Sequence, residues 1–152
     1  MLIRINEALA KRRAALKNDE GFTLIELLVV VIIIGILAAI AIPVYLGIQN
    51  NAKESATQTD LGNAKTAVIA YQTDTGSLPT AGLLTSSVLP AKYGFTKSGN
   101  TNSITLTTGG TASAPTFCIA AVSITTTSFG ATDSLGVAKG TCASDGTFSP
   151  AP

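Results

Sequence analysis

The stretch GFTLIELLVVVIIIGILAAIAIPVYLGIQNNA, residues 21–52, decides the fold of this chain. It has no charged side chain from Leu27 to Ala52, and Leu27 to Ile42 is wholly apolar apart from one glycine. A helix over residues 22–48 would be about 40 Å long at 1.5 Å per residue, and a bilayer core is about 30 Å thick. We therefore predict a membrane-spanning helix. The alternative is a buried helix of a soluble core, but a helix apolar on all sides needs a large protein around it.

The charges on either side of this stretch indicate its orientation. Residues 1–21 hold five of the ten basic residues, including all three arginines, and the chain after Gly21 has five lysines and six acids. The positive-inside tendency therefore predicts a cytoplasmic N-terminus and a C-terminal part outside the membrane. The net charge of +1 over 152 residues is too small a basic excess to make nucleic acid an expected partner.

The composition also limits the chemistry of the chain. There is no histidine, which excludes Ser-His-Asp and Cys-His catalysis and every metal site that contains histidine. A membrane-anchored enzyme is the alternative from another class, with Asp133 and Asp145 as its acids, but nothing in their spacing marks a catalytic pair. We predict no enzymatic activity, no cofactor and no metal site.

The residues Gly21-Phe22-Thr23-Leu24-Ile25-Glu26-Leu27-Leu28-Val29-Val30 resemble the N-terminal motif of type IV pilins and the related pseudopilins. The resemblance is close over about residues 21–55 and is one of layout only beyond about residue 80. It includes Gly21 before the apolar run, Phe22 directly after this glycine, and Glu26 at the fifth position counted from Phe22. It also includes Gly35 and Pro43. It implies that a prepilin peptidase cuts after Gly21 and that Phe22 becomes an N-methylated N-terminus. Residues 1–21 would then be a leader.

Glu26 is the residue of this motif with the clearest physical meaning. A charge at mid-bilayer costs about 2.5–3.5 kcal/mol, so even near one end of the helix the carboxylate needs a partner. Cleavage before Phe22 would create an amine four residues away, on the same helix face or beside Glu26 of a neighbouring subunit. A subunit out of register would leave both charges buried and unpaired, so we expect Glu26 to set register between subunits. The alternative is an acid favoured by the helix dipole.

Gly35 and Pro43 weaken the same helix, by about 1 and about 3 kcal/mol. Filaments of the family often have this stretch extended, so the resemblance gives both residues a role in assembly. In an isolated subunit we expect a kink and no break. The alternative is that both residues are simply tolerated, as they commonly are in membrane helices.

Residues 53–76 predict an amphipathic continuation of the hydrophobic helix of residues 22–52. Leu61, Ala64, Val68 and Tyr71 recur at three- and four-residue spacing, and the helix should end near Gly76. Residues 77–152 lack a helical period and predict a β-rich head of three to five antiparallel strands. The expected fold class is α+β, with the helix packed on the sheet. The candidate strands are Tyr93–Thr96, Ser103–Thr107, Phe117–Ile124 and Thr125–Phe129.

Cys118 and Cys142 both lie in the part expected outside the membrane. An even cysteine count in an oxidising compartment favours a disulfide, and two free thiols are the alternative. Closing this loop would stabilise the head by roughly 3.5 kcal/mol. In the resembling family, a disulfide often bounds a C-terminal loop that faces partners. Pro150 and Pro152 indicate a loose tail after Cys142.

The resemblance implies a structural subunit of a type IV pilus, held in the plasma membrane as a single-pass prepilin and then polymerised with copies of itself into an extracellular filament. It also implies three further partners: the prepilin peptidase, a membrane assembly platform and an ATPase motor. The alternative is a pseudopilin of a type II secretion or competence (DNA-uptake) pseudopilus, built with the same helix. Glu26 argues against the tip type that lacks this acid, but it does not separate major pilin, minor pilin and pseudopilin.

Overall fold

The computed structural model describes residues 21–111 and 114–151. Most of the expected leader, residues 1–20, therefore lies outside the described residues. The chain divides into two compact units, Met1–Val44 and Tyr45–Pro152, and the helix α2 (Leu24–Thr75) contributes residues to both.

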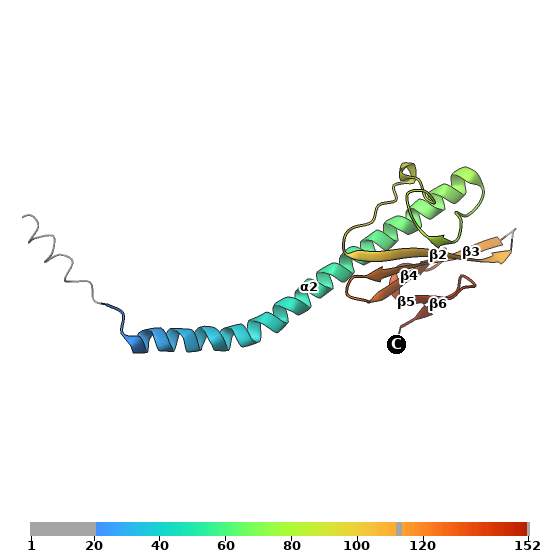
Figure 1. Ribbon diagram of the computed structural model, residues 1–152. Coiled ribbons are helices and arrows are strands. Elements are labelled where there is room, and N and C mark those ends of the chain that lie inside the picture. The colour runs from blue at the N-terminus through green and yellow to red at the C-terminus, as the bar shows by residue number, and fades with distance from the viewer. Residues whose placement is uncertain (1–20, 112–113, 152) are drawn as a thin grey trace, which may run out of the picture. The chain divides into compact units, whose positions relative to one another are not determined.

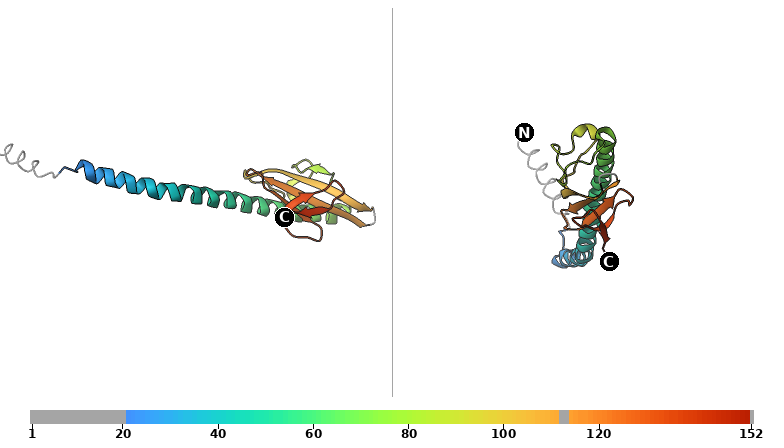
Figure 2. Two further views of the ribbon diagram at one scale, coloured as in Figure 1. Left: turned by 90° about the horizontal axis from the view of Figure 1, so that it is seen from below. Right: turned by 90° about the vertical axis from the view of Figure 1, so that its right-hand side faces the viewer.

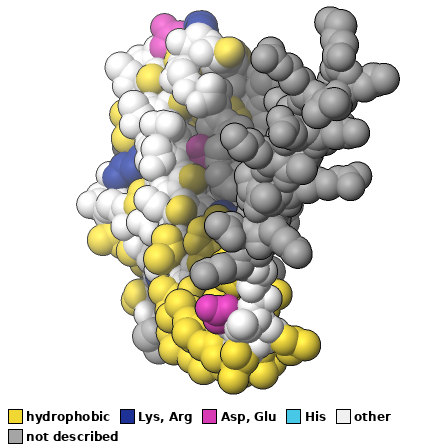
Figure 3. Space-filling view, turned by 90° about the vertical axis from the view of Figure 1, so that its left-hand side faces the viewer, with side chains coloured by type: hydrophobic (Ala, Val, Ile, Leu, Met, Phe, Trp, Pro, Cys, Tyr) yellow, Lys and Arg dark blue, Asp and Glu magenta, His cyan; other side chains and the backbone are white. Residues whose placement is uncertain are grey.

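In the first unit, α2 is long and apolar enough to cross a membrane, and its most apolar window buries nothing against the rest of the described chain. Its large side chains are all exposed, from Leu24 at 82% to Val30 at 47%. Figure 3 shows hydrophobic side chains gathered around an acidic group in one part of the surface. The helix continues through Gly35 and Pro43 without a break, as expected for an isolated subunit.

The second unit contains the later part of α2 and six antiparallel strands in the simple order β1-β2-β3-β4-β5-β6 (Figure 1). The fold class is α+β, as predicted, with one strand more than the expected maximum of five. A short 3₁₀ helix, η2, precedes β2. The elements are β1 Gly82–Leu83, η2 Ala91–Tyr93, β2 Thr101–Thr111, β3 Ala114–Ser123, β4 Ser128–Thr132, β5 Ala138–Cys142 and β6 Phe148–Pro150.

A hydrophobic core lies between α2 and one face of the sheet, and two views show them packed together (Figure 2). Leu61, Ala64 and Val68 of the predicted helical stripe are fully buried, and Tyr71 is partly buried beside them. The helix ends at Thr75, because Gly76 adopts φ +77° and donates its N–H to the carbonyl of Gln72 at 2.8 Å. The sheet contributes Ile104, Leu106, Phe117, Ile119, Ala121, Phe129 and Ala131.

Two candidate strands were correct and two were wrong. Ser103–Thr107 and Phe117–Ile124 correspond to β2 and β3. Tyr93–Thr96 is no strand, because η2 ends there in Gly94 with φ +81°. Thr125–Phe129 begins as a turn, with Thr126 at φ +69°, and only its end enters β4.

The expected loose tail after Cys142 is also wrong. Residues Phe148–Pro150 form β6, the last strand in the strand order, which pairs with β5 on one side, so that a proline without an N–H group is tolerated. The N–H of Ala151 continues the pairing by donating to the carbonyl of Lys139 at 3.0 Å. The sequence also gave no signal for β1 and β5.

Candidate functional site: the start of the hydrophobic helix

The candidate site is the point where the chain enters α2. Gly21, Phe22 and Thr23 are non-helical, and α2 begins at Leu24. Thr23 is therefore the N-cap residue and Glu26 is the third residue of the helix. A small hollow is lined by Gly21, Phe22, Thr23 and Glu26, so the expected processing residues and the expected assembly acid lie together.

Thr23 and Glu26 form a reciprocal capping box. The Thr23 hydroxyl donates to Oε2 of Glu26 at 2.7 Å, and the Thr23 N–H donates to the same oxygen at 2.9 Å. The N–H of Glu26 points back to Oγ1 of Thr23 at 3.3 Å. These bonds satisfy donors that the first turn of a helix leaves free. The Glu26 side chain thus caps the start of α2 together with Thr23.

The surroundings of this carboxylate are apolar and exposed. Phe22 is 80% exposed, Leu24 82% and Ile25 66%. A carboxylate with such neighbours is stable in water, but it needs a charged partner once the neighbours are covered. Sequence reasoning missed the role of Thr23, although the pattern Thr-x-x-Glu before an apolar run is a known signature of a helix start.

Gly35 and Pro43 lie farther along the exposed helix and away from this hollow. A side chain at Gly35 would meet nothing within 4 Å, so no contact among the described residues explains the glycine. Pro43 lies inside α2.

The disulfide is confirmed: Cys118 and Cys142 are joined, with their Cα atoms 5.7 Å apart. Cys118 lies on β3 and Cys142 on β5, two strands that are separated by β4 in the strand order. The segment between the two cysteines therefore contains strands.

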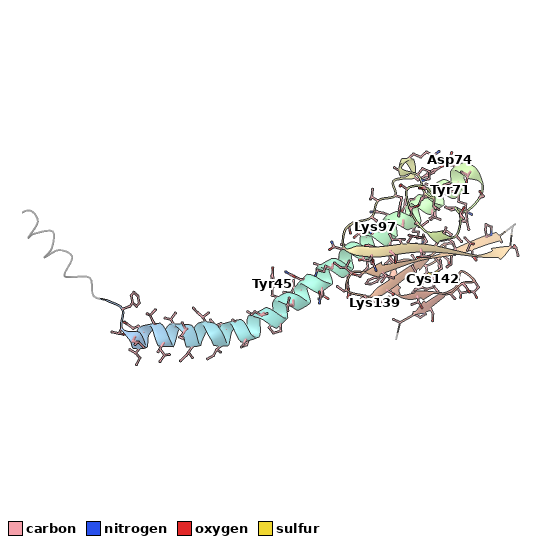
Figure 4. The ribbon with its side chains drawn as sticks, viewed as in Figure 1. Tyr45, Tyr71, Asp74, Lys97, Lys139 and Cys142 are labelled. Atoms are coloured by element: carbon pink, nitrogen blue, oxygen red, sulfur yellow. A yellow bond between two sulfur atoms is a disulfide. The ribbon has the colours of Figure 1, made fainter. Side chains whose placement is uncertain are left out.

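Three acids of the second unit connect α2 to the head, and sequence reasoning missed them. Oδ2 of buried Asp60 accepts bonds from the N–H of Ser98 at 2.9 Å and the hydroxyls of Ser98 and Thr101 at 2.7 and 2.5 Å. Asp74 accepts bonds from the Tyr93 hydroxyl at 2.6 Å and from the Lys92 ammonium at 2.9 Å (Figure 4).

The third acid, Glu54, contacts the β3–β4 turn and β5. Its Oε1 accepts a bond from the Thr127 hydroxyl at 2.6 Å, and its Oε2 forms an ion pair with Lys139 at 3.1 Å. The Thr127 bond, followed by the bond and charge of Lys139, lowers the pKa of Glu54 below its usual value.

One of the two acids named for the enzyme alternative is hydrogen-bonded within its own turn. Asp145 accepts bonds from the N–H and hydroxyl of Thr147 at 2.9 and 2.6 Å, within its own turn. Within residues 21–111 and 114–151, no three His, Cys, Asp or Glu residues gather into a group that could hold a metal ion.

Comparison with known proteins agrees with the geometry at the helix start. Residues 16–42 match the family model described as the prokaryotic N-terminal methylation motif. The N-terminal region is therefore similar to that of type IV pilins and related proteins. The chain is 41% identical over 79 residues to a fimbrial protein of Neisseria meningitidis, covering 49% of this chain and 46% of that protein.

Two other proteins are similar to parts of the chain. The type IV major pilin protein PilA of Myxococcus xanthus is 54% identical over 50 residues, covering 33% of this chain and 23% of the pilin. The type II secretion system core protein G of Vibrio cholerae is 37% identical over 65 residues, covering 43% of this chain and 44% of that protein. The matches thus span less than half the length of these relatives, and no solved structure is significantly similar to the chain.

Proposed function

We propose that this chain is a structural subunit of a type IV pilus, inserted in the membrane as a prepilin, cut after Gly21 and polymerised through its N-terminal helix. The observation that carries this proposal is the exposed apolar surface of α2 from Leu24 to Ile48 around one carboxylate, Glu26. A surface of this size needs a covering of lipid or protein. A lipid bilayer covers it before assembly, and the helices of other copies cover it afterwards.

The start of α2 supports the proposed processing. The Gly21–Phe22 peptide bond lies outside the helix, so its backbone is free of the α2 hydrogen-bond ladder. Cleavage there gives Phe22 an amine, which stays cationic when it is N-methylated. In the filament this amine pairs with Glu26 of a neighbouring subunit, and a misplaced subunit leaves two unpaired buried charges.

The proposed division of the chain follows from this function. Residues 1–21 are the leader, 22–52 the membrane and assembly helix, 53–76 the amphipathic half and 77–152 the head. Gly35 and Pro43 lower the free-energy cost of converting the helical segment between them into extended chain in the filament, because both residues weaken α-helical structure.

The proposed location follows from the charges. The basic leader keeps the N-terminus in the cytoplasm and the head outside. The prepilin peptidase, an assembly platform and an ATPase motor are the partners that such processing and polymerisation require.

A second candidate function is a pseudopilin of a type II secretion or DNA-uptake machine. It is favoured by the 37% identity to the core protein G of the Vibrio cholerae type II secretion system. Both functions use the same helix and the same processing, and they differ in the length and abundance of the polymer.

Intact mass and N-terminal sequencing of protein sheared from cells test the proposal. The pilus subunit should be abundant in the sheared material, should begin at Phe22 and should carry one added methyl group. A processed chain that stays with the cells would favour the pseudopilin. A chain that retains residues 1–21 and never polymerises would refute both functions.

A further inference from the structure

The last two strands form a hairpin that is complete in itself. β5 and β6 pair at Gly140–Pro150, Thr141–Ser149 and Cys142–Phe148. Their turn is closed by the N–H of Ala143, which donates to the carbonyl of Thr147 at 2.9 Å, and Gly146 adopts φ +80°. The hairpin therefore makes its own backbone bonds and needs few from the rest of the head.

This hairpin lies on the sheet face opposite the hydrophobic core. Ile119 and Ala131 are paired across β3 and β4 and belong to the core, so the alternate pairs Cys118–Thr132 and Ala120–Gly130 face the other way. A Cβ on Gly130 would lie 2.5 Å from Cε2 of the Phe148 ring and 3.5 Å from Sγ of Cys142. The glycine is thus required for the close approach of β6.

The turn of the hairpin makes a second close approach. A Cβ on Gly109 of β2 would collide with the backbone carbonyl of Asp145, and one on Gly146 would lie 2.9 Å from the Gly109 nitrogen. The hairpin therefore reaches over the sheet face from β4 to β2. We name residues 138–151 the C-terminal flap.

The flap has few attachments to the head. β5 pairs with β4 only at Lys139–Phe129 and Ala138–Gly130. Two side-chain latches add to this pairing: the Cys118–Cys142 disulfide to β3 and the Lys139–Glu54 ion pair to α2 (Figure 4). No residue of the flap, all of which the structure describes, belongs to the hydrophobic core, so the core does not depend on it.

We propose that the C-terminal flap is a redox-controlled cover that opens as a unit when its disulfide is reduced, while the helix and β1–β4 stay folded. The reductant is a dithiol. Its thiolate attacks Sγ of half-buried Cys142, the S–S bond breaks, and fully buried Cys118 leaves as a thiolate that takes up a proton. The second thiol of the reductant then displaces Cys142, which gives two protein thiols and an oxidised dithiol.

Opening changes the surface that the head offers to partners. It uncovers the edge of β4 at Phe129 and Gly130 and the sheet face that carries Cys118 and Ala120. An uncovered strand edge invites pairing with another chain. Oxidising conditions outside the membrane keep the flap closed and this edge covered.

Hydrogen exchange read by mass spectrometry tests the proposal on the full chain in detergent micelles, with and without dithiothreitol. After reduction, verified by intact mass, peptides from 138–151 should exchange at least about tenfold faster. Peptides from β2, from β3 and from residues 57–75 of α2 should change by less than about twofold. Increased exchange across the whole head, or a flap that stays protected after full reduction, would overturn the proposal.

Two variants serve as controls. The double variant Cys118→Ser with Cys142→Ser should show the open pattern with or without dithiothreitol. Lys139→Gln removes the ion pair with Glu54 and the cation–π contact with the Phe129 ring, and it should keep the flap closed while the disulfide is intact. An open flap in oxidised Lys139→Gln would mean that the disulfide is not the controlling latch, which would contradict the proposal. None of these outcomes depends on whether the chain forms a pilus.

Discussion

The two halves of α2 differ completely in what covers them. Between Leu24 and Ile48 every large hydrophobic side chain is exposed, whereas Leu61, Ala64 and Val68 are fully buried under the sheet. One continuous helix therefore has a half that is complete within the subunit and a half that is not. The second half is part of a packed core, whereas the first half presents an apolar surface that the described chain does not cover.

The carboxylates of the two halves differ in the same way. Asp60 and Glu54 are bound by several groups of the head, whereas Glu26 is bound by Thr23 alone, at an exposed end. Acids of the second half are satisfied within the subunit. Glu26, the acid of the first half, accepts hydrogen bonds from Thr23, which do not neutralise the negative charge of its carboxylate.

The largest expected effect is on assembly. Glu26→Ala should leave membrane insertion intact, because it makes the helix more apolar, and should abolish or greatly slow polymerisation, because the amine of Phe22 loses its partner. Immunoblots of membrane and sheared fractions measure both steps. Glu54→Gln is the matched control, since it removes a carboxylate from the same helix and should still assemble. Normal filaments from Glu26→Ala would refute the proposal that Glu26 sets the register between subunits.

The next effect is on the stability of the head. Leu61→Ala leaves a cavity in the core and should lower the free energy of unfolding of the head by about 2–5 kcal/mol. Ile69→Ala, at a side chain that is 41% exposed, should change it far less. Thermal unfolding in detergent, followed by circular dichroism, compares the two; equal losses would contradict the assignment of the core face.

A smaller loss is expected at Asp60. Asp60→Ala leaves the hydroxyls of Ser98 and Thr101 without their acceptor and should cost about 1–3 kcal/mol. The same unfolding measurement detects it. Faster hydrogen exchange should be confined to residues 97–101, which this acid holds against the helix, and a change spread over the sheet would argue against that local role.

The smallest effect is a dependence on pH. The folded head lowers the pKa of Glu54 from its ordinary value of 4.5. Its contribution to stability is therefore present above pH 4.5 and is lost as the pH falls through the lowered pKa. Melting temperatures measured from pH 6 to pH 3 should fall less in Glu54→Gln than in the unmodified chain, whereas identical pH profiles would show that Glu54 makes no such contribution.

The sequence predicted the parts of the fold that local chemistry determines. The apolar run, the buried stripe at Leu61, Ala64 and Val68, and the stop at Gly76 each depend on nearby residues. Glu26 was found because a single acid in an apolar run is conspicuous. Thr23 was missed, although the Thr-x-x-Glu pattern of residues 23–26 is a local signature of a helix start.

The rest could not be predicted because it depends on contacts between distant residues. β5 and β6 read AKGTC and FSP, with no hydrophobic alternation, and they are held by the Cys118–Cys142 bond and by close approaches at glycines. Thr125–Phe129 has strand-like composition, but a tight turn at Thr126 takes its first residues. Tertiary structure overrides local propensity in β5 and β6, whereas at Thr125–Phe129 the turn between β3 and β4 does so.

The most direct test of the central claim asks where the charge partner of Glu26 comes from. Filaments assembled from a mixture of isotopically heavy and light chains are treated with a hydrophobic carbodiimide, which joins a carboxylate to a neighbouring amine, and the peptides are analysed by mass spectrometry. The account predicts links between Phe22 of one isotope and Glu26 of the other. Links confined to single chains, or an absence of Phe22–Glu26 links in assembled filaments, would contradict it.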